Sequence, residues 1–197
     1  MMKILQYPHP SLRHPAKPLT AISERLRTAA AKMLELMYEH RGLGLAAPQV
    51  GLPYQFIVLN PTGDPEQKDQ EGVYLNPVVL DKKGSQEGDE GCLSFPGLFQ
   101  KVRRAKTVRV QAYDLNGNAL EITANNLGAR LWLHEIDHLH GVLYIDKFSD
   151  VAKLAARDQL RTFEYDYRKA QEKGEIPPDE EVEKELRAAE DEFPPIL

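Results

Sequence analysis

The sequence predicts an α+β fold in which short antiparallel strands pack around one buried helix, with a further helix toward the C-terminus. Alternating apolar and polar residues over 107–113 and 119–123, joined by an Asn-Gly turn, indicate a β-hairpin with one buried face. Residues 127–140 are apolar on nearly every side, which indicates a helix inside the core. Residues 150–173 have helical periodicity and end at Gly174, so they supply the C-terminal helix.

The N-terminal part of the chain is predicted to be an extended arm followed by an amphipathic helix. Residues 1–20 hold four prolines, so we expect them to wrap the surface, with His9 and His14 in solvent. Apolar residues recur at helical spacing over residues 20–40, and Gly42 provides a stop.

A loop and several short strands are expected after this helix. Residues 42–51 contain glycine and proline but no charge, which is typical of a loop pressed against the core or a ligand. Residues 56–59, 73–75 and 78–80 favour strands, and Pro77 predicts an edge or a bulge between the last two.

The ends of the two later helices carry recognisable signals. Asn125-Asn126 is a suitable capping pair for the buried helix, and Gly141 is a suitable stop. Residues 142–145 are expected to add a final strand. Ser149 is placed to cap the C-terminal helix.

Length and composition fit a single domain with an extension. The chain has 197 residues, of which 42% are hydrophobic and 28% charged, the balance of an ordinary globular protein. We expect one domain over residues 1–173, including the C-terminal helix, and an extension over residues 174–197. The sequence has no apolar run long enough to cross a bilayer, no signal or transit pattern at its start, and only one cysteine. Together these features predict a cytoplasmic protein.

The negative charge is concentrated in the extension. The net charge is −5, and residues 175–197 hold nine acids and two bases, so this segment carries −7 and the remainder +2. This distribution does not indicate a nucleic-acid-binding surface. The extension is expected to be either disordered or a helix over about 178–193, with an apolar stripe formed by Val182, Leu186, Ala189 and Phe193.

The buried helix carries the HExxH motif His134-Glu135-Ile136-Asp137-His138. Two histidines four residues apart lie on one face of a helix, so both imidazoles can reach one metal ion, with Glu135 beside it. A catalytic site of this kind needs a third protein ligand and an open position for water.

Three candidates for that third ligand follow from the sequence. A metzincin-type site needs a histidine where this chain has Tyr144, so that pattern fails. A thermolysin-type site would use a downstream glutamate, for which Glu164 is the nearest candidate. The remaining candidate is Cys92, whose thiolate would complete a tetrahedral site, although a lone cysteine is often only a small buried side chain.

Three segments together resemble the signature motifs of the peptide deformylases. They are Gly42-Leu43-Gly44-Leu45-Ala46-Ala47-Pro48-Gln49, Glu90-Gly91-Cys92-Leu93-Ser94 and His134-Glu135-Ile136-Asp137-His138-Leu139-His140-Gly141. The opening residues 4–13 are also similar to the start of that family, and the likeness covers about residues 1–170. It implies a metallohydrolase that removes the formyl group from the N-formylmethionine of nascent chains and releases formate.

The resemblance also implies roles for individual residues. Metal ligands would be Cys92, His134 and His138, with Fe²⁺ favoured and Zn²⁺ or Ni²⁺ as alternatives. Glu135 would move the proton of the attacking water. The oxyanion would be held by the Leu93 N–H and the Gln49 amide, and the substrate would be bound by Leu43, Gly44 and Leu127.

The partners implied are an N-formylmethionyl nascent peptide and, transiently, the ribosome, without direct nucleic-acid or membrane binding. The acidic extension opposes contact with ribosomal RNA. Two functions stand as alternatives, an HExxH metalloendopeptidase and a non-catalytic relative that binds metal or a nascent chain.

Residues around the motif depart from the family pattern in two places. Leu133 stands where glutamine is common, and residues 95–99 stand where some relatives carry an arginine that pairs with the glutamate of the cysteine motif. We expect Arg130, one helical turn before His134, to pair with Glu90 in its place. Asp137 is expected to support a ligand or cap the helix.

Overall fold

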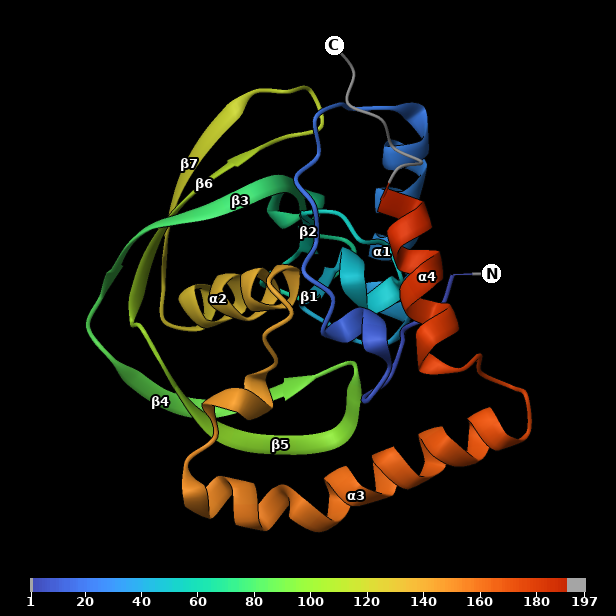
Figure 1. Cartoon of the computed structure of the whole chain (residues 1–197). Coiled ribbons are helices and arrows are strands. Elements are labelled where there is room, and N and C mark those ends of the chain that lie inside the picture. The colour runs from blue at the N-terminus through green and yellow to red at the C-terminus, as the bar shows by residue number, and fades with distance from the viewer. Residues whose placement is uncertain (1, 191–197) are drawn as a thin grey trace.

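The computed structural model describes residues 2–190 and has an α+β architecture, as predicted (Figure 1). One antiparallel sheet has the strand order β1-β2-β3-β6-β7, and a separate two-stranded sheet joins β4 to β5. The strands are β1 (Gly44–Ala46), β2 (Phe56–Leu59), β3 (Gly72–Lys83), β4 (Gln86–Cys92), β5 (Phe95–Arg104), β6 (Thr107–Tyr113) and β7 (Ala119–Asn125). The α-helices are α1 (Glu24–Glu39), α2 (Leu127–Leu139), α3 (Asp150–Glu172) and α4 (Asp179–Glu190).

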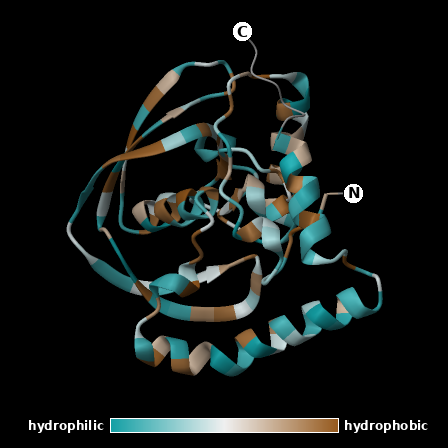
Figure 2. Ribbon diagram, in the orientation of Figure 1, coloured by the Kyte–Doolittle hydropathy of each residue, from teal (hydrophilic) through white to brown (hydrophobic). Residues whose placement is uncertain are grey.

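Helix α2 lies at the centre of the molecule, between the five-stranded sheet and the β4–β5 hairpin (Figure 1). Its apolar side chains, among them Ala129, Trp132 and Ile136, share one core cluster with sheet residues such as Ile57 and Val110. Figure 2 shows the contrast in hydropathy, since α2 is largely brown and α3 mostly teal. The prediction of a buried central helix is therefore confirmed, and this burial holds the HExxH motif in a fixed frame.

The helix ends differ in part from the expectation. Gly141 follows the C-cap residue with a φ of 68°, as the predicted stop requires. The capping role assigned to Asn125-Asn126 is wrong, because Asn126 has a φ of 51° and its side chain makes no cap hydrogen bond. Its backbone carbonyl instead accepts a hydrogen bond from Gln86 Nε2 at 2.7 Å, which ties the helix start to β4.

Substitution of Gly141 by alanine is expected to lower the free energy of unfolding by about 2 kcal/mol more than substitution of Gly174. Both glycines have a positive φ, but only at Gly141 would a Cβ collide with a backbone carbonyl, that of Arg13; nothing lies within 4 Å at Gly174. Urea unfolding of both variants measures the difference. Equal losses of stability in the two variants would show that the Arg13 backbone moves away from the new Cβ at no cost in free energy.

The segment predicted as a loop contains regular structure. Gly44–Ala46 pairs with β2, and Ala47–Val50 forms a short 3₁₀ helix. The loop prediction for residues 42–51 is therefore wrong in part. The segment is uncharged because most of it is buried under α1 and α2.

The strands in the middle of the chain are longer than predicted. Residues 72–83 form one strand, and the register shift between Leu75 and Val78 is the bulge expected at Pro77, with Asn76 at a φ of 48°. The hairpin of β4 and β5 was not predicted. The strand expected at residues 142–145 is absent, since Tyr144–Lys147 forms a 3₁₀ turn instead.

The N-terminal arm is mostly irregular but has one 3₁₀ turn at Pro10–Leu12, where Ser11 and Leu12 are buried. The prediction that His9 and His14 lie in solvent is wrong. The His9 ring accepts a hydrogen bond from the Ser11 N–H, and His14 Nε2 lies 2.7 Å from Glu190 Oε1. The arm is held in place because α4 packs against it (Figure 1).

The acidic extension contains the expected helix over Asp179–Glu190. Val182 and Leu186 of the predicted apolar stripe are buried, and the Ala189 carbonyl accepts a hydrogen bond from Tyr54 Oη. Phe193, the last residue of that stripe, lies outside the described residues. Ser149 caps α3 as predicted, its Oγ accepting a hydrogen bond from the Ala152 N–H.

Candidate metal centre

One side chain from the β4–β5 hairpin meets two buried side chains of α2. Cys92 ends β4, and His134 and His138 lie one turn apart on α2. Cys92 Sγ lies 3.3 Å from His138 Nε2, which lies 3.2 Å from His134 Nε2. Among residues 2–190 this is the only group of potential ligand atoms gathered within 4.8 Å of one another.

These three atoms fit a metal ion. Tetrahedral bonds of about 2.0–2.1 Å to nitrogen and 2.3 Å to sulfur place neighbouring ligand atoms roughly 3.3–3.6 Å apart, close to the separations found here. Burial lowers the pKa of His138 well below its ordinary value, so this imidazole is neutral with a free lone pair. Glu164 lies on α3 and binds Tyr7 Oη at 2.8 Å, so it is not the third ligand.

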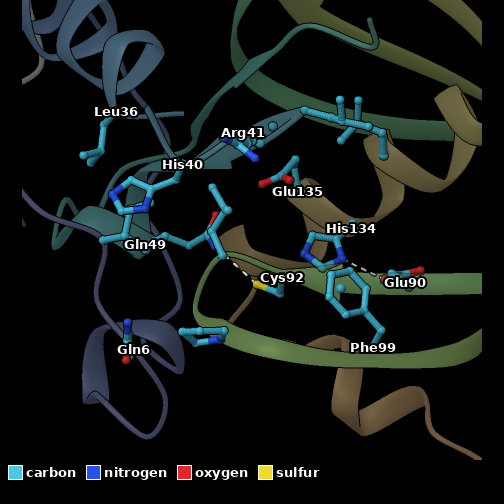
Figure 3. Close-up of a pocket in the computed structure, with 18 of the residues that line it drawn as sticks. Gln6, Leu36, His40, Arg41, Gln49, Glu90, Cys92, Phe99, His134 and Glu135 are labelled. Atoms are coloured by element: carbon cyan, nitrogen blue, oxygen red, sulfur yellow. Dashed lines mark hydrogen bonds and ion pairs between the residues drawn. The ribbon is translucent and has the colours of Figure 1, made fainter. Parts of the chain in front are cut away.

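Glu90 orients the first histidine. Its Oε1 lies 2.7 Å from His134 Nδ1 (Figure 3). This contact leaves His134 Nε2 free to face His138 Nε2, 3.2 Å away. Burial alone would raise the pKa of Glu90, but hydrogen bonds from His134 and Arg104 and their charges hold it well below its ordinary value. Glu90 is therefore a buried carboxylate at neutral pH.

Two buried arginines neutralise Glu90. Arg130 Nη1 donates to Glu90 Oε2 at 2.6 Å, so the expected pairing is present. Arg104, which the sequence analysis did not single out, donates to both carboxylate oxygens, at 2.5 and 3.1 Å, and also pairs with Asp137. The expectation that Arg130 replaces an arginine after the cysteine motif is therefore wrong, because Arg104 follows that motif and Arg130 is a second partner of Glu90. Asp137 contacts Arg104 and Lys147 rather than a ligating histidine, so its expected support of a ligand is indirect.

Glu135 faces the pocket beside the three ligand atoms (Figure 3). It is 3% exposed, and its Oε2 has no hydrogen-bond partner among the described residues. Burial, aided by the charge of Glu90, raises its pKa to about 7. A Cβ on Gly44 would lie 2.6 Å from Glu135 Oε1, so only glycine in β1 leaves room for this carboxylate.

Gln49, on the 3₁₀ helix Ala47–Val50, contacts Cys92. Its Oε1 accepts a hydrogen bond from the Ala46 N–H at 2.9 Å, which turns Nε2 toward Cys92 Sγ at 3.4 Å and Ser94 Oγ at 3.1 Å. Leu93 follows Cys92 at the turn between β4 and β5. The Gln49 amide therefore lies at the candidate metal ligands, and Leu93 is next to Cys92 in the chain.

A pocket of about 870 Å³ opens from this point. Leu43, Gly44 and Leu127 line it, as expected of substrate-binding residues, although Leu127 is 55% exposed. Phe99, which was not predicted and is 67% exposed, also lines the pocket. A ligand that covers both apolar side chains would remove substantial apolar area from water.

Comparison with known proteins decides the family. The family model for polypeptide deformylase matches residues 1–154. This chain belongs to the peptide deformylase family. The deformylase of Rhodopirellula baltica is 40% identical over 175 residues, which cover 89% of this chain and 87% of that protein. The Arabidopsis thaliana deformylase 1B, named chloroplastic/mitochondrial, is also 40% identical, over 92% of this chain and 66% of that longer protein.

Solved deformylase structures agree with this assignment. A plant peptide deformylase crystal structure superposes with a TM-score of 0.83 and 39% identity, covering 89% of this chain and 94% of that one. The Legionella pneumophila enzyme gives 0.77 and 39%, covering 84% and 96%. This deformylase is thus a metal-dependent hydrolase that removes the formyl group from nascent polypeptides. Within residues 2–190, no helix has both the length and the apolar content needed to cross a bilayer.

Proposed function

We propose that Cys92, His134 and His138 hold the divalent ion of this deformylase and that Glu135 is its acid/base. The observation that carries the proposal is the meeting of these three ligand atoms beside a buried carboxylate with an unpartnered oxygen. A bound ion would polarise the formyl carbonyl and lower the pKa of a water to about 7. Glu135 takes the proton of that water and delivers it to the departing amine.

The remaining polar groups bind and orient the substrate. The formyl oxygen gains negative charge as water adds, and the Gln49 Nε2–H and the Leu93 N–H are the donors proposed for it. The Gly44 carbonyl accepts a hydrogen bond from the substrate backbone. Leu43 and Leu127 contact the methionine side chain, which an apolar pocket of this size accommodates.

Fe²⁺ is the ion we propose, with Zn²⁺ and Ni²⁺ as alternatives that the same thiolate and imidazole ligands accept. The location proposed is the cytoplasm, where bacterial nascent chains carry formylmethionine. Residues 1–173 are proposed as the catalytic unit. Any ribosome contact is transient and avoids α4, because its first turn carries Asp179, Glu180 and Glu181.

A formate-release assay tests the function. Protein loaded anaerobically with Fe²⁺ is incubated with formyl-Met-Ala-Ser and with an unformylated octapeptide. Formate release from the first substrate, with the octapeptide left uncut, is expected. Cleavage of the octapeptide would favour the metalloendopeptidase, and metal binding without either reaction would favour a non-catalytic relative.

A further inference from the structure

A second groove, of about 580 Å³, lies beside the active-site pocket. One wall is the N-terminal arm, and the other is formed by α3 and residues 175–177. The groove and the pocket share the wall residues Lys3, Ile4, Gln6 and Pro96. Figure 3 shows Gln6 at the end of the pocket away from Glu90 and Phe99, so the groove continues from that end.

The groove has apolar and aromatic walls. Tyr7 and Tyr167 line it, and their hydroxyl groups bind Glu164 at 2.8 Å and Asp179 at 3.0 Å. Tyr167 is only 6% exposed, so the partly exposed Tyr7 offers more surface to a ligand. Phe163, Ala170 and Ile176 add further apolar surface. Such walls suit side chains of mixed size better than a phosphate or a nucleotide.

Few polar groups interrupt these walls. His9 Nδ1 accepts a hydrogen bond from the Ser11 N–H, so the proton of the neutral ring is on Nε2. Burial, and next the charge of Lys3, lower the pKa of His9 to about 4, which keeps this ring neutral. The lining holds one cation, Lys3, and two acids, Asp166 and Glu175, so its net charge is only −1. Apolar walls with scattered hydrogen-bonding groups and little net charge are what an extended peptide requires.

The location of the groove indicates its occupant. The family model ends at residue 154, so the α3 wall and residues 175–177 belong to the part of the chain beyond it. The substrate is a polypeptide, and the residues after its methionine must leave the pocket along the surface. An extended chain advances about 3.3 Å per residue, so a few residues reach from the pocket into an adjoining groove.

We propose that this groove binds the segment of the nascent polypeptide that begins a few residues after the formylmethionine. The inference rests on the proposed function, because the occupant is the downstream part of the same substrate. In this proposal α3 and the N-terminal arm help to determine which nascent chains are deformylated most efficiently. Apolar downstream segments are favoured over segments of glycine and serine.

Peptide length tests the proposal. The substrates are formyl-Met-Ala-Ser, the same peptide extended by Leu-Val-Ala-Leu-Lys, and the same peptide extended by Gly-Ser-Gly-Ser-Gly. We expect kcat/KM of the apolar octapeptide to exceed that of the tripeptide by about fivefold or more, and the Gly-Ser octapeptide to resemble the tripeptide.

The Ala170→Trp variant fills the groove from α3, and Ala155→Trp is the matched control on an exposed face of the same helix. The octapeptide-to-tripeptide ratio should fall to about one in A170W and stay at the parent value in A155W. Ile176→Asp, which places a charge in the same groove from the following segment, is expected to lower the ratio as well.

The ratio of kcat/KM for the octapeptide to kcat/KM for the tripeptide distinguishes failure of the groove proposal from failure of the proposed function. A parent ratio near one, or a ratio that A170W and I176D leave unchanged, would overturn the groove proposal while deformylation itself stands. Loss of turnover on every peptide by the metal-loaded parent would instead overturn the proposed function. Circular dichroism of A170W establishes that it is folded, and I176D decides the question if it is not.

Discussion

The Glu135→Gln substitution is expected to lower kcat for formyl-Met-Ala-Ser by about 10²–10⁴-fold while one metal ion per chain stays bound. The amide keeps the shape of the side chain but cannot take a proton from water. Glu135 is buried, and the ligand atoms come from its neighbours Cys92, His134 and His138, so the metal site should survive.

Formate release and elemental analysis on the same samples measure the two parts of this prediction. Glu35→Gln is the control, because Glu35 is an exposed carboxylate on α1 that does not line the pocket. A Glu135→Gln variant whose kcat is within threefold of the parent value would show that Glu135 is not the acid/base of the reaction. Loss of metal together with activity would assign it to metal binding instead.

The Glu90→Gln substitution is expected to lower the free energy of unfolding by about 3–5 kcal/mol, the cost of leaving buried charges without their partner. Arg130 would face a neutral amide and Arg104 would keep only Asp137, and these two side chains are buried, at 8% and 4% exposed. Metal affinity should fall by about 10–100-fold, because His134 would lose the carboxylate that orients its ring.

Glu87→Gln on the same strand is the matched control for this prediction. Glu87 is exposed, and its nearest ion-pair partner, Arg103, is 3.9 Å away, so the change should cost less than about 0.5 kcal/mol. Urea unfolding of the metal-free variants gives the stability, and competition with a chelator gives the affinity. A Glu90→Gln protein as stable as Glu87→Gln would mean that the buried arginines find other partners.

The helical parts of the fold could be predicted because their signals are local. The spacing of His134 and His138, the nearly continuous apolar residues around them and the stop at Gly141 all lie within one element. Helix α4 was also predictable, because the apolar residues Val182 and Leu186 are one helical turn apart in the sequence. Both are buried in the structure.

The parts that were missed depend on contacts between distant segments. The β4–β5 hairpin escaped prediction because residues 86–91 are polar and rich in glycine, without an apolar alternation. Its burial pattern is unusual, since Glu90 faces inward to meet arginines from β5 and α2. Arg104 lies two residues after the buried Val102, and a strand assignment there would have placed it on the inner face. In the same way, 142–145 looks like a strand, but none of the strands within residues 2–190 pairs with it.

The chemical nature of the site could be predicted from the sequence, but the arrangement of its residues in space could not. The HExxH motif identifies two ligands, but nothing local to Cys92 distinguishes a thiolate ligand from a small buried side chain. The structure places Cys92 Sγ 3.3 Å from His138 Nε2, a contact across 46 residues of sequence.

The relation between bound metal and formate release tests the metal centre most directly. Protein stripped of metal is reconstituted anaerobically with increasing Fe²⁺, and bound metal and the rate on formyl-Met-Ala-Ser are measured on each sample, for the parent and for Cys92→Ser. We expect the parent rate to rise from zero in proportion to bound metal up to one ion per chain. Cys92→Ser should bind Fe²⁺ far more weakly, because a neutral hydroxyl is a poor substitute for a thiolate. Formate release by the metal-free parent, or a Cys92→Ser protein that retains one ion per chain and the parent rate, would contradict the proposed centre.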